Sequence, residues 1–170
     1  MGLKDPFQCV ITMTTHPDMV FHLPTSTRFA VAVHTLAALA VNEGRPVRSQ
    51  DLARSASTHP AVIRSILSRL ADAGLSTAQM GLGGGALLAR PAGKISLFDV
   101  YKAVEDCEIF SLHRSPPDEK CVVGKYIQAA MLPALDRARR ALEEELQRVS
   151  IAEVAADIAR RGQFTIPWQG

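Results

Sequence analysis

Residues 59–90 constrain the fold more than any other part of the chain, because a helical period is followed at once by a glycine-rich hairpin pattern. The letters HPAVIRSILSRLADAGL predict a helix, with Pro60 in the first turn and Gly74 at the C-terminal stop. The letters STAQMGLGGGALLAR then predict two short strands around a glycine tip. A helix that leads directly into such a hairpin fits few architectures.

The helix expected over 60–73 has two populated faces. Its apolar stripe consists of Val62, Ile63, Ile66, Leu67 and Leu70. Its opposite face consists of Ala61, Arg64, Ser65, Ser68 and Asp72. The pattern indicates a surface helix that presents a polar side.

Further helices are expected before and after this segment. Ser26 and Ser49 are candidate N-caps for helices over 27–43 and 50–56, and Ser96 caps a helix that begins at 97. Ser150 and Glu153 form a capping box for a helix at the C-terminal end.

A long helical pattern lies between the last two of these helices. Its apolar residues recur at spacings of three and four: Ile127, Met131, Leu135, Ala138, Leu142, Leu146 and Val149. This seam indicates a partner helix, and Pro133 predicts a kink or a break near Leu132. The fold class expected is mainly α with a small β-wing: a winged helix-turn-helix domain plus a long C-terminal dimerisation helix.

The glycines at 81–85 are typical of a loop that cradles phosphates, and three interpretations compete. A nucleotide site requires a strand before the glycines and a helix after them, whereas here a helix precedes and an extended run follows. A plain hairpin turn is the second. In the third, the glycines form a wing whose main chain approaches DNA phosphates.

The third interpretation assigns DNA contacts along the segment. Ala61, Arg64 and Ser65 face bases, and Arg64 can reach a guanine edge; as an alternative, Arg64 is solvated or contacts phosphate only. The expected backbone contacts are Arg28, Arg48, Ser49, Gln50, Thr58, His59, Arg69, Gly81, Gly83, Gly84 and Arg90. A winged-helix module that binds protein instead of DNA stays open as an alternative.

The charge distribution agrees with a nucleic-acid partner. Residues 25–94 carry eight basic and three acidic side chains, a net charge of +5, whereas residues 95–170 carry a net −2. The residues offer no pattern for an enzyme, such as a nucleophile elbow or paired carboxylates with a matched base.

Several quoted stretches together resemble one family: STRFAVAVHTLAALA, HPAVIRSILSRLADAGL, GLGGGALLAR, ISLFDVYKAVE and CVVGKYIQ. They are similar, in this order, to the Rrf2 family of bacterial transcription regulators, which includes IscR and NsrR, and most to its YwnA-like branch. The resemblance covers residues 26–158 and implies a homodimeric winged-helix DNA-binding protein whose long C-terminal helix pairs the subunits, through the seam at Ile127, Met131, Leu135, Leu142 and Leu146. We therefore expect a sequence-specific transcription regulator, a repressor, that binds a pseudo-palindromic site. Met80 departs from the family, because the position before Gly81 is often basic there.

The pattern divides the chain into four parts. Residues 1–24 show no sustained period and contain three prolines, so we expect a poorly ordered extension there. The other expected parts are the winged helix-turn-helix DNA-binding domain at 25–95, a linking helix with a sensor-type loop at 96–121, and the dimerisation helix with the C-terminal helix at 122–160.

Cysteines bear on cofactors and regulation. Several family members hold an iron–sulfur cluster through three cysteines before the long helix, but only Cys107 and Cys121 occur there, so no cofactor is expected. A metal site that adds His113 stays open as an alternative. Cys121 is a candidate redox sensor beside Lys120 and Lys125, with Cys107 as a second candidate; the alternative for Cys121 is a small buried hydrophobe.

With no membrane span or signal peptide in the pattern, a cytoplasmic location is expected.

Overall fold

The computed structural model describes residues 26–105, 110, 112–113 and 115–164, which form six α-helices, a 3-10 turn and one two-stranded sheet. The first half contains α1 (Arg28–Val41), α2 (Ser49–Ser55), α3 (Pro60–Asp72), β1 (Ser76–Gln79) and β2 (Gly85–Leu88). The second half contains η1 (Ala92–Lys94), α4 (Leu97–Val104), α5 (Val122–Arg148) and α6 (Ile151–Gly162). The expected extension at 1–24 lies outside the described residues.

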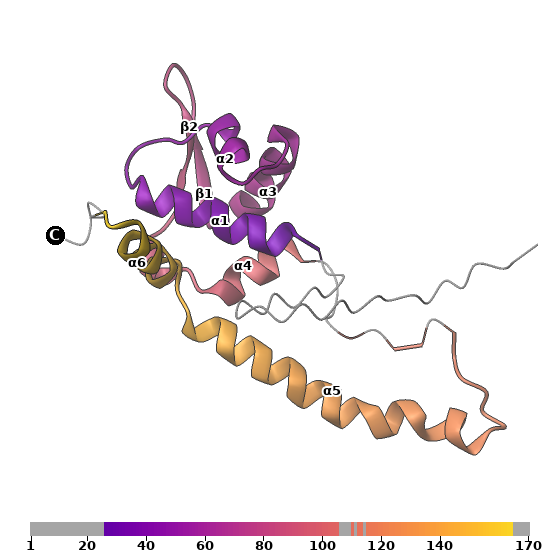
Figure 1. Cartoon of the computed structure of the whole chain (residues 1–170). Coiled ribbons are helices and arrows are strands. Elements are labelled where there is room, and N and C mark those ends of the chain that lie inside the picture. Colours follow the sequence, from indigo (N-terminus) through magenta and orange to yellow (C-terminus); the bar gives the residue numbers. More distant parts are fainter. Residues whose placement is uncertain (1–25, 106–109, 111, 114, 165–170) are drawn as a thin grey trace, which may run out of the picture.

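One hydrophobic core unites α1, α3, α4 and α6. α1 lies across the middle of the molecule, with α2 and α3 on one side and α4 and α6 on the other (Figure 1). The largest fully buried side chains include Leu36, Ile63, Leu70, Val104 and Ile151. Because α4 and α6 bury residues in the same core as α1 and α3, the packed body extends beyond the boundary expected at residue 95.

Helix starts differ from the sequence prediction in detail. α1 begins at Arg28 with Thr27 as N-cap, so the prediction of Ser26 is wrong by one residue; Ser26 Oγ still accepts from the Arg28 N–H at 3.1 Å. α2 has Arg48 as N-cap, and Ser49 is its first residue. Helix ends shift by a residue or two when tertiary contacts satisfy the first N–H groups, as Glu105 does for Phe29 N–H at 3.2 Å.

The predicted hairpin is confirmed. β1 and β2 pair antiparallel, from Ser76 opposite Leu88 to Gln79 opposite Gly85, and residues 80–84 form the tip. The sequence prediction omits a third contribution: Val47 and Ala86 exchange two main-chain hydrogen bonds of 3.0 and 2.9 Å. This bridge attaches the base of the wing to the segment before α2.

α5 extends away from the helical body for most of its length (Figure 1). It runs unbroken through Pro133, so the expected break near Leu132 is wrong. Proline has no N–H group, so the carbonyl of Ala129, four residues before Pro133, receives no helical hydrogen bond. Both residues are exposed, so water can bond to this carbonyl and the helix can continue. The helix is 27 residues long, which corresponds to about 40 Å.

Candidate nucleic-acid interface

The turn between α2 and α3 fixes the angle at which α3 is presented. Ser57 adopts a left-handed backbone with φ +49°, and the Thr58 N–H donates to the Ala53 carbonyl at 2.9 Å. His59 is the N-cap of α3, and its Nδ1 accepts from the Ala61 N–H at 3.1 Å. Thr58 and His59, predicted as DNA-backbone contacts, therefore also shape the turn, and Pro60 starts the helix as predicted.

α3 presents the polar face that the sequence predicts. All five predicted members are exposed: Ala61, Arg64, Ser65, Ser68 and Asp72. Ile63, Ile66 and Leu70 are buried on the opposite side, and Leu67 is half-buried. Val62 departs from the prediction, since it is 41% exposed. The buried stripe is centred on Ile63, Ile66 and Leu70, and Val62 lies at its edge.

The arginines predicted to contact DNA differ in whether another residue of the chain holds their guanidinium groups. Arg64 is exposed and forms no hydrogen bond or ion pair within the described part of the chain, so its guanidinium can meet an outside partner. Arg48 is also exposed but pairs with Asp51 at 3.1 Å across the first turn of α2. Such surface pairs contribute little to stability and exchange readily for a phosphate. Gln50 is exposed beside them, and Ser49 is half-buried.

Arg28 and Arg69 are held by the C-terminal end of α4. Arg28 Nη2 lies 3.6 Å from Glu105 Oε2, and Arg69 Nη1 donates to the Val104 carbonyl at 3.3 Å. Glu105 is almost buried, with 12% of its side chain exposed. Arg28, at the start of α1, and Arg69, in the last turn of α3, are thus held in fixed positions. The sequence shows no local signal for these contacts, because the partners are about 35 and 77 positions away.

The glycines of the wing are required by its geometry. Gly81 and Gly83 have φ values of +95° and +81°, which side chains disfavour. Gly84 and Gly85 have no room for a Cβ atom, which would lie 2.3 Å from the Gln79 carbonyl oxygen and 2.6 Å from that of Val47. Residues 80–83 of the tip are exposed to solvent, and Leu82 is the most exposed side chain among them. The main chain at the tip is therefore accessible, as a contact with phosphates requires.

Arg90 lies at the base of the wing and not at its tip. Its Nη2 is 3.0 Å from Asp99 Oδ2, and its Nε is buried without a hydrogen-bond partner among the described residues. Burial opposes ionisation of Asp99, but hydrogen bonds from Ser96, together with Arg90 and Lys102, hold the pKa of Asp99 below its ordinary value. Arg90 thus supports the fold, and we leave it out of the proposed interface.

α5 carries a second candidate surface. No residue of α5, all of which the structure describes, is buried. Of the predicted seam, Met131 and Leu142 are exposed, while Ile127, Leu135 and Leu146 are half-buried. Within one chain this apolar seam has little to pack against.

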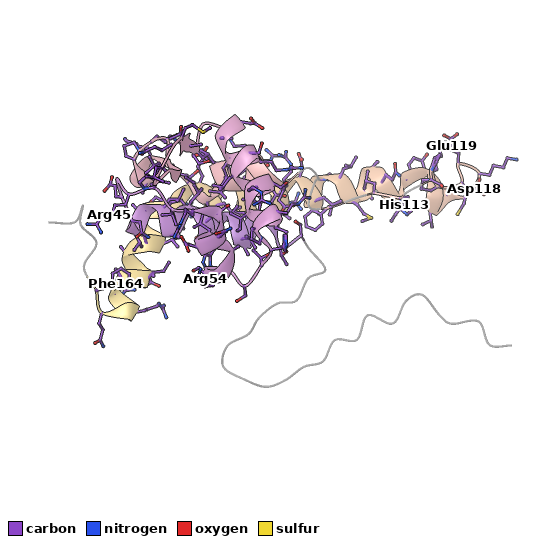
Figure 2. The ribbon with its side chains drawn as sticks, turned by 90° about the horizontal axis from the view of Figure 1, so that it is seen from above. Arg45, Arg54, His113, Asp118, Glu119 and Phe164 are labelled. Carbon is purple, nitrogen blue, oxygen red and sulfur yellow. The ribbon has the colours of Figure 1, made fainter. Side chains whose placement is uncertain are left out.

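Cys121 is the N-cap residue of α5 and is exposed, so the alternative of a small buried hydrophobe is wrong in the single chain. Hydrogen bonds from the Gly124 and Val123 N–H groups lower the pKa of the Cys121 thiol. Figure 2 shows His113, Asp118 and Glu119 toward the projecting end of the molecule, far from the helical body. Cys107 lies outside the described residues.

The comparisons with known proteins agree with this architecture. Residues 25–157 match the Rrf2 family model, described as an iron-dependent transcriptional regulator. The chain belongs to the Rrf2 family. It is 38% identical to YwnA of Bacillus subtilis (strain 168), named as an HTH-type transcriptional regulator, over 76% of this chain and 95% of YwnA. The expectation of a transcription regulator and not an enzyme is confirmed by this membership.

Solved structures extend the likeness. A protein from Lactobacillus plantarum, named as a transcriptional regulator, superimposes with a TM-score of 0.68 at 27% identity, covering 80% of this chain and 92% of that one. CymR, the global cysteine regulator of B. subtilis, shares the fold with a TM-score of 0.61 at 20% identity, over 79% of this chain and 97% of CymR. The predicted fold class of a mainly α protein with a small β-wing is confirmed.

The family description raises the question of iron. The described residues contain no group of three or more His, Cys, Asp or Glu side chains that could hold a metal ion. Cys121 and His113 are exposed, and each would need further ligands. The described part of this Rrf2 chain does not fit an iron site. Among the described helices, none is long and apolar enough to cross a membrane.

Proposed function

We propose that this Rrf2 chain acts in the cytoplasm as a homodimeric repressor that binds a pseudo-palindromic DNA site. α3 enters the major groove, and the glycine wing lies against the phosphate backbone. The single observation that carries the proposal is the exposed face of α3. On this face Arg64 lies among the small residues Ala61, Ser65 and Ser68 and forms no hydrogen bond or ion pair within the described part of the chain. Helix residues of this kind reach base edges, and a long cation among them supplies both attraction and discrimination.

The roles of the other residues follow from their positions. Ala61 and Ser65 face bases beside Arg64. The turn residues Thr58 and His59 and the main chain of the wing hold the DNA backbone, together with Arg28 of α1 and Arg69 of α3. Arg48, Ser49 and Gln50 at the start of α2 contact phosphates through the Arg48 guanidinium and the polar side chains of the other two residues.

Arg64→Ala tests this function. Binding is measured by fluorescence anisotropy on a duplex found by binding-site selection and on a random duplex. The variant is expected to lose about tenfold to 100-fold in affinity for the selected duplex, since a bidentate base contact contributes ~1–3 kcal/mol. It should lose much less on random DNA. The control is Arg137→Ala, which removes an exposed, unpaired arginine from α5.

Two outcomes would contradict the proposal. For wild type, the logarithm of the affinity should fall linearly with the logarithm of the salt concentration; a salt-independent interaction argues for the protein-binding alternative. Equal losses on selected and random DNA would make Arg64 a phosphate contact.

We further propose that Cys121 modulates DNA binding by oxidation. Its thiolate attacks one oxygen of a hydroperoxide, the O–O bond breaks, and a sulfenic acid forms as water or an alcohol leaves. Exposure and the lowered pKa of the thiol favour this reaction. Hydrogen peroxide is expected to change the operator affinity of wild type and of Cys107→Ser but not of Cys121→Ser. Unchanged affinity in wild type would refute it.

A further inference from the structure

α3 leaves one valine in the open on the side that faces the start of α1. Val62 is 41% exposed, although β-branched residues are weak helix formers and an apolar side chain gains nothing in water. Neither helix propensity nor the core accounts for valine at this position. A single exposed apolar residue is common on protein surfaces. The residues around Val62 therefore decide whether it belongs to a binding surface.

Those surroundings form a groove of about 300 Å³ between α1 and α3. Its lining residues are Arg28, Ala61, Val62, Ser65, Ile66 and Arg69. The middle of the groove is apolar apart from one hydroxyl, and a guanidinium group from each helix lines it. Such a groove suits a ligand with a small apolar group between negative charges.

The two arginines are fixed in place. Arg28 is held by Glu105, and Arg69 is held by the carbonyl of Val104, so both depend on the end of α4. Because these contacts exist in the single chain, the groove is formed before any ligand arrives, which lowers the entropic cost of binding. Ala61 and Ser65 of the same groove belong to the face that the proposed function sets against bases.

We propose that Val62 determines base specificity by contacting the 5-methyl group of a thymine in each half-site, while Arg28 and Arg69 contact the phosphates on either side of it. This inference rests on the proposed function. The thymine methyl is the apolar group that unmodified DNA presents in the major groove, and small apolar side chains are its usual partners. Arg64 and Val62 lie on opposite edges of the presented face of α3, so a half-site contains a guanine and a thymine at separate positions.

The test removes the methyl group from the DNA. Each thymine of the selected operator is replaced in turn by deoxyuridine, which differs only by that methyl. Wild type is expected to lose about fourfold in affinity at one symmetry-related position in each half-site, since burial of one methyl-sized group contributes ~0.8 kcal/mol. Val62→Ala should bind the thymine and uracil operators equally well.

Val122→Ala is the matched control, because it shortens an exposed valine at the far end of α5 from α3 (Figure 1). It should keep the wild-type difference between thymine and uracil. The thermal unfolding midpoint of Val62→Ala should be no lower than that of wild type, because the side chain is partly exposed and alanine is the better helix former. Val62→Thr, which keeps the shape but exchanges a methyl for a hydroxyl, should also reduce the difference.

The outcomes separate the inference from the function it rests on. The role of Val62 is overturned if no uracil substitution in the operator changes the affinity of wild type. It is also overturned if Val62→Ala still binds the thymine operator more tightly than the uracil operator. Failure to select any duplex overturns the proposed function itself.

Discussion

Ser96 and Ser150 lie opposite each other in an isolated antiparallel bridge, and each is the N-cap of the helix that follows it. The Leu97 N–H donates to the Val149 carbonyl at 2.9 Å, and the Ile151 N–H donates to the Ile95 carbonyl at 2.8 Å. α4 and α6 thus begin at one point, each with a complete capping box. This junction connects the projecting α5 to the core.

Loss of either cap should destabilise the body. Ser96→Ala and Ser150→Ala are each expected to lower the free energy of unfolding by ~1 kcal/mol, because an N-cap hydroxyl satisfies a helix N–H that alanine leaves unpaired. Urea denaturation followed by circular dichroism measures the change. Ser115→Ala, an exposed serine outside the helices, is the control. Wild-type stability in both cap variants would show that the bridge alone holds the junction.

Asp99 should make stability dependent on acid pH. Its folded pKa is lowered from 3.8, so its contribution is complete above about pH 4 and is lost as the pH falls through the lower folded pKa. Asp99→Asn is expected to cost ~1–2 kcal/mol at pH 7, since hydrogen bonds to a charged group are removed, and to flatten the dependence on pH below 4. The measurement is denaturation at pH 7, 4, 3 and 2. An equal cost at every pH would contradict the assignment.

Ser57 offers a stabilising substitution. A non-glycine residue at φ +49° costs about 1 kcal/mol relative to glycine. Ser57→Gly should therefore raise the thermal midpoint by a few degrees, and Ser57→Val, whose branched side chain tolerates this region poorly, should lower it. Differential scanning calorimetry on wild type and both variants measures the three unfolding midpoints, which are expected to rise from Ser57→Val through wild type to Ser57→Gly. A lower midpoint for Ser57→Gly would show that the entropy of the unfolded chain outweighs the strain.

Gly85 should tolerate no side chain. A Cβ atom there meets the Val47 main chain at 2.6–2.9 Å, so Gly85→Ala is expected to break the Val47–Ala86 bridge, to cost ~2 kcal/mol or more, and to weaken DNA binding through the displaced wing. Gly93→Ala is the matched control, because its nearest neighbour would be Ala152 Cβ at 3.8 Å. Equal stability of the two variants would argue against the close approach.

The seam of α5 should control the oligomeric state. In the proposed homodimer, Leu142→Glu would place a carboxylate among the apolar side chains that pair the subunits, so it is expected to convert the dimer to a monomer. Gln147→Glu adds the same charge on another side of α5 and should stay dimeric. Sedimentation equilibrium distinguishes the two. A Leu142→Glu variant that remains a dimer would show that another surface pairs the subunits.

Periodic features were predictable and distant pairings were not. The two faces of α3, the hairpin and both capping boxes depend on residues within a few positions of one another, so the sequence displays them directly. The spacing of Val62 fits the apolar stripe and predicts a core position, whereas its 41% exposure places it at the edge of that stripe. The contacts of Arg28, Arg69 and Arg90 with α4 depend on the packed core, and the bridge at Val47 lacks a strand long enough to give a period.

The projecting α5 has a consequence for gene dosage. If its seam is covered only by a second subunit, then a scarce regulator is present mainly as single chains with one DNA-reading helix each. Dimer concentration then falls with the square of the number of copies, so occupancy of the operator declines more steeply than expression does. For the proposed dimeric repressor, halving the synthesis of this chain would lower the dimer concentration by up to about fourfold, so operator occupancy would fall without any inducing signal.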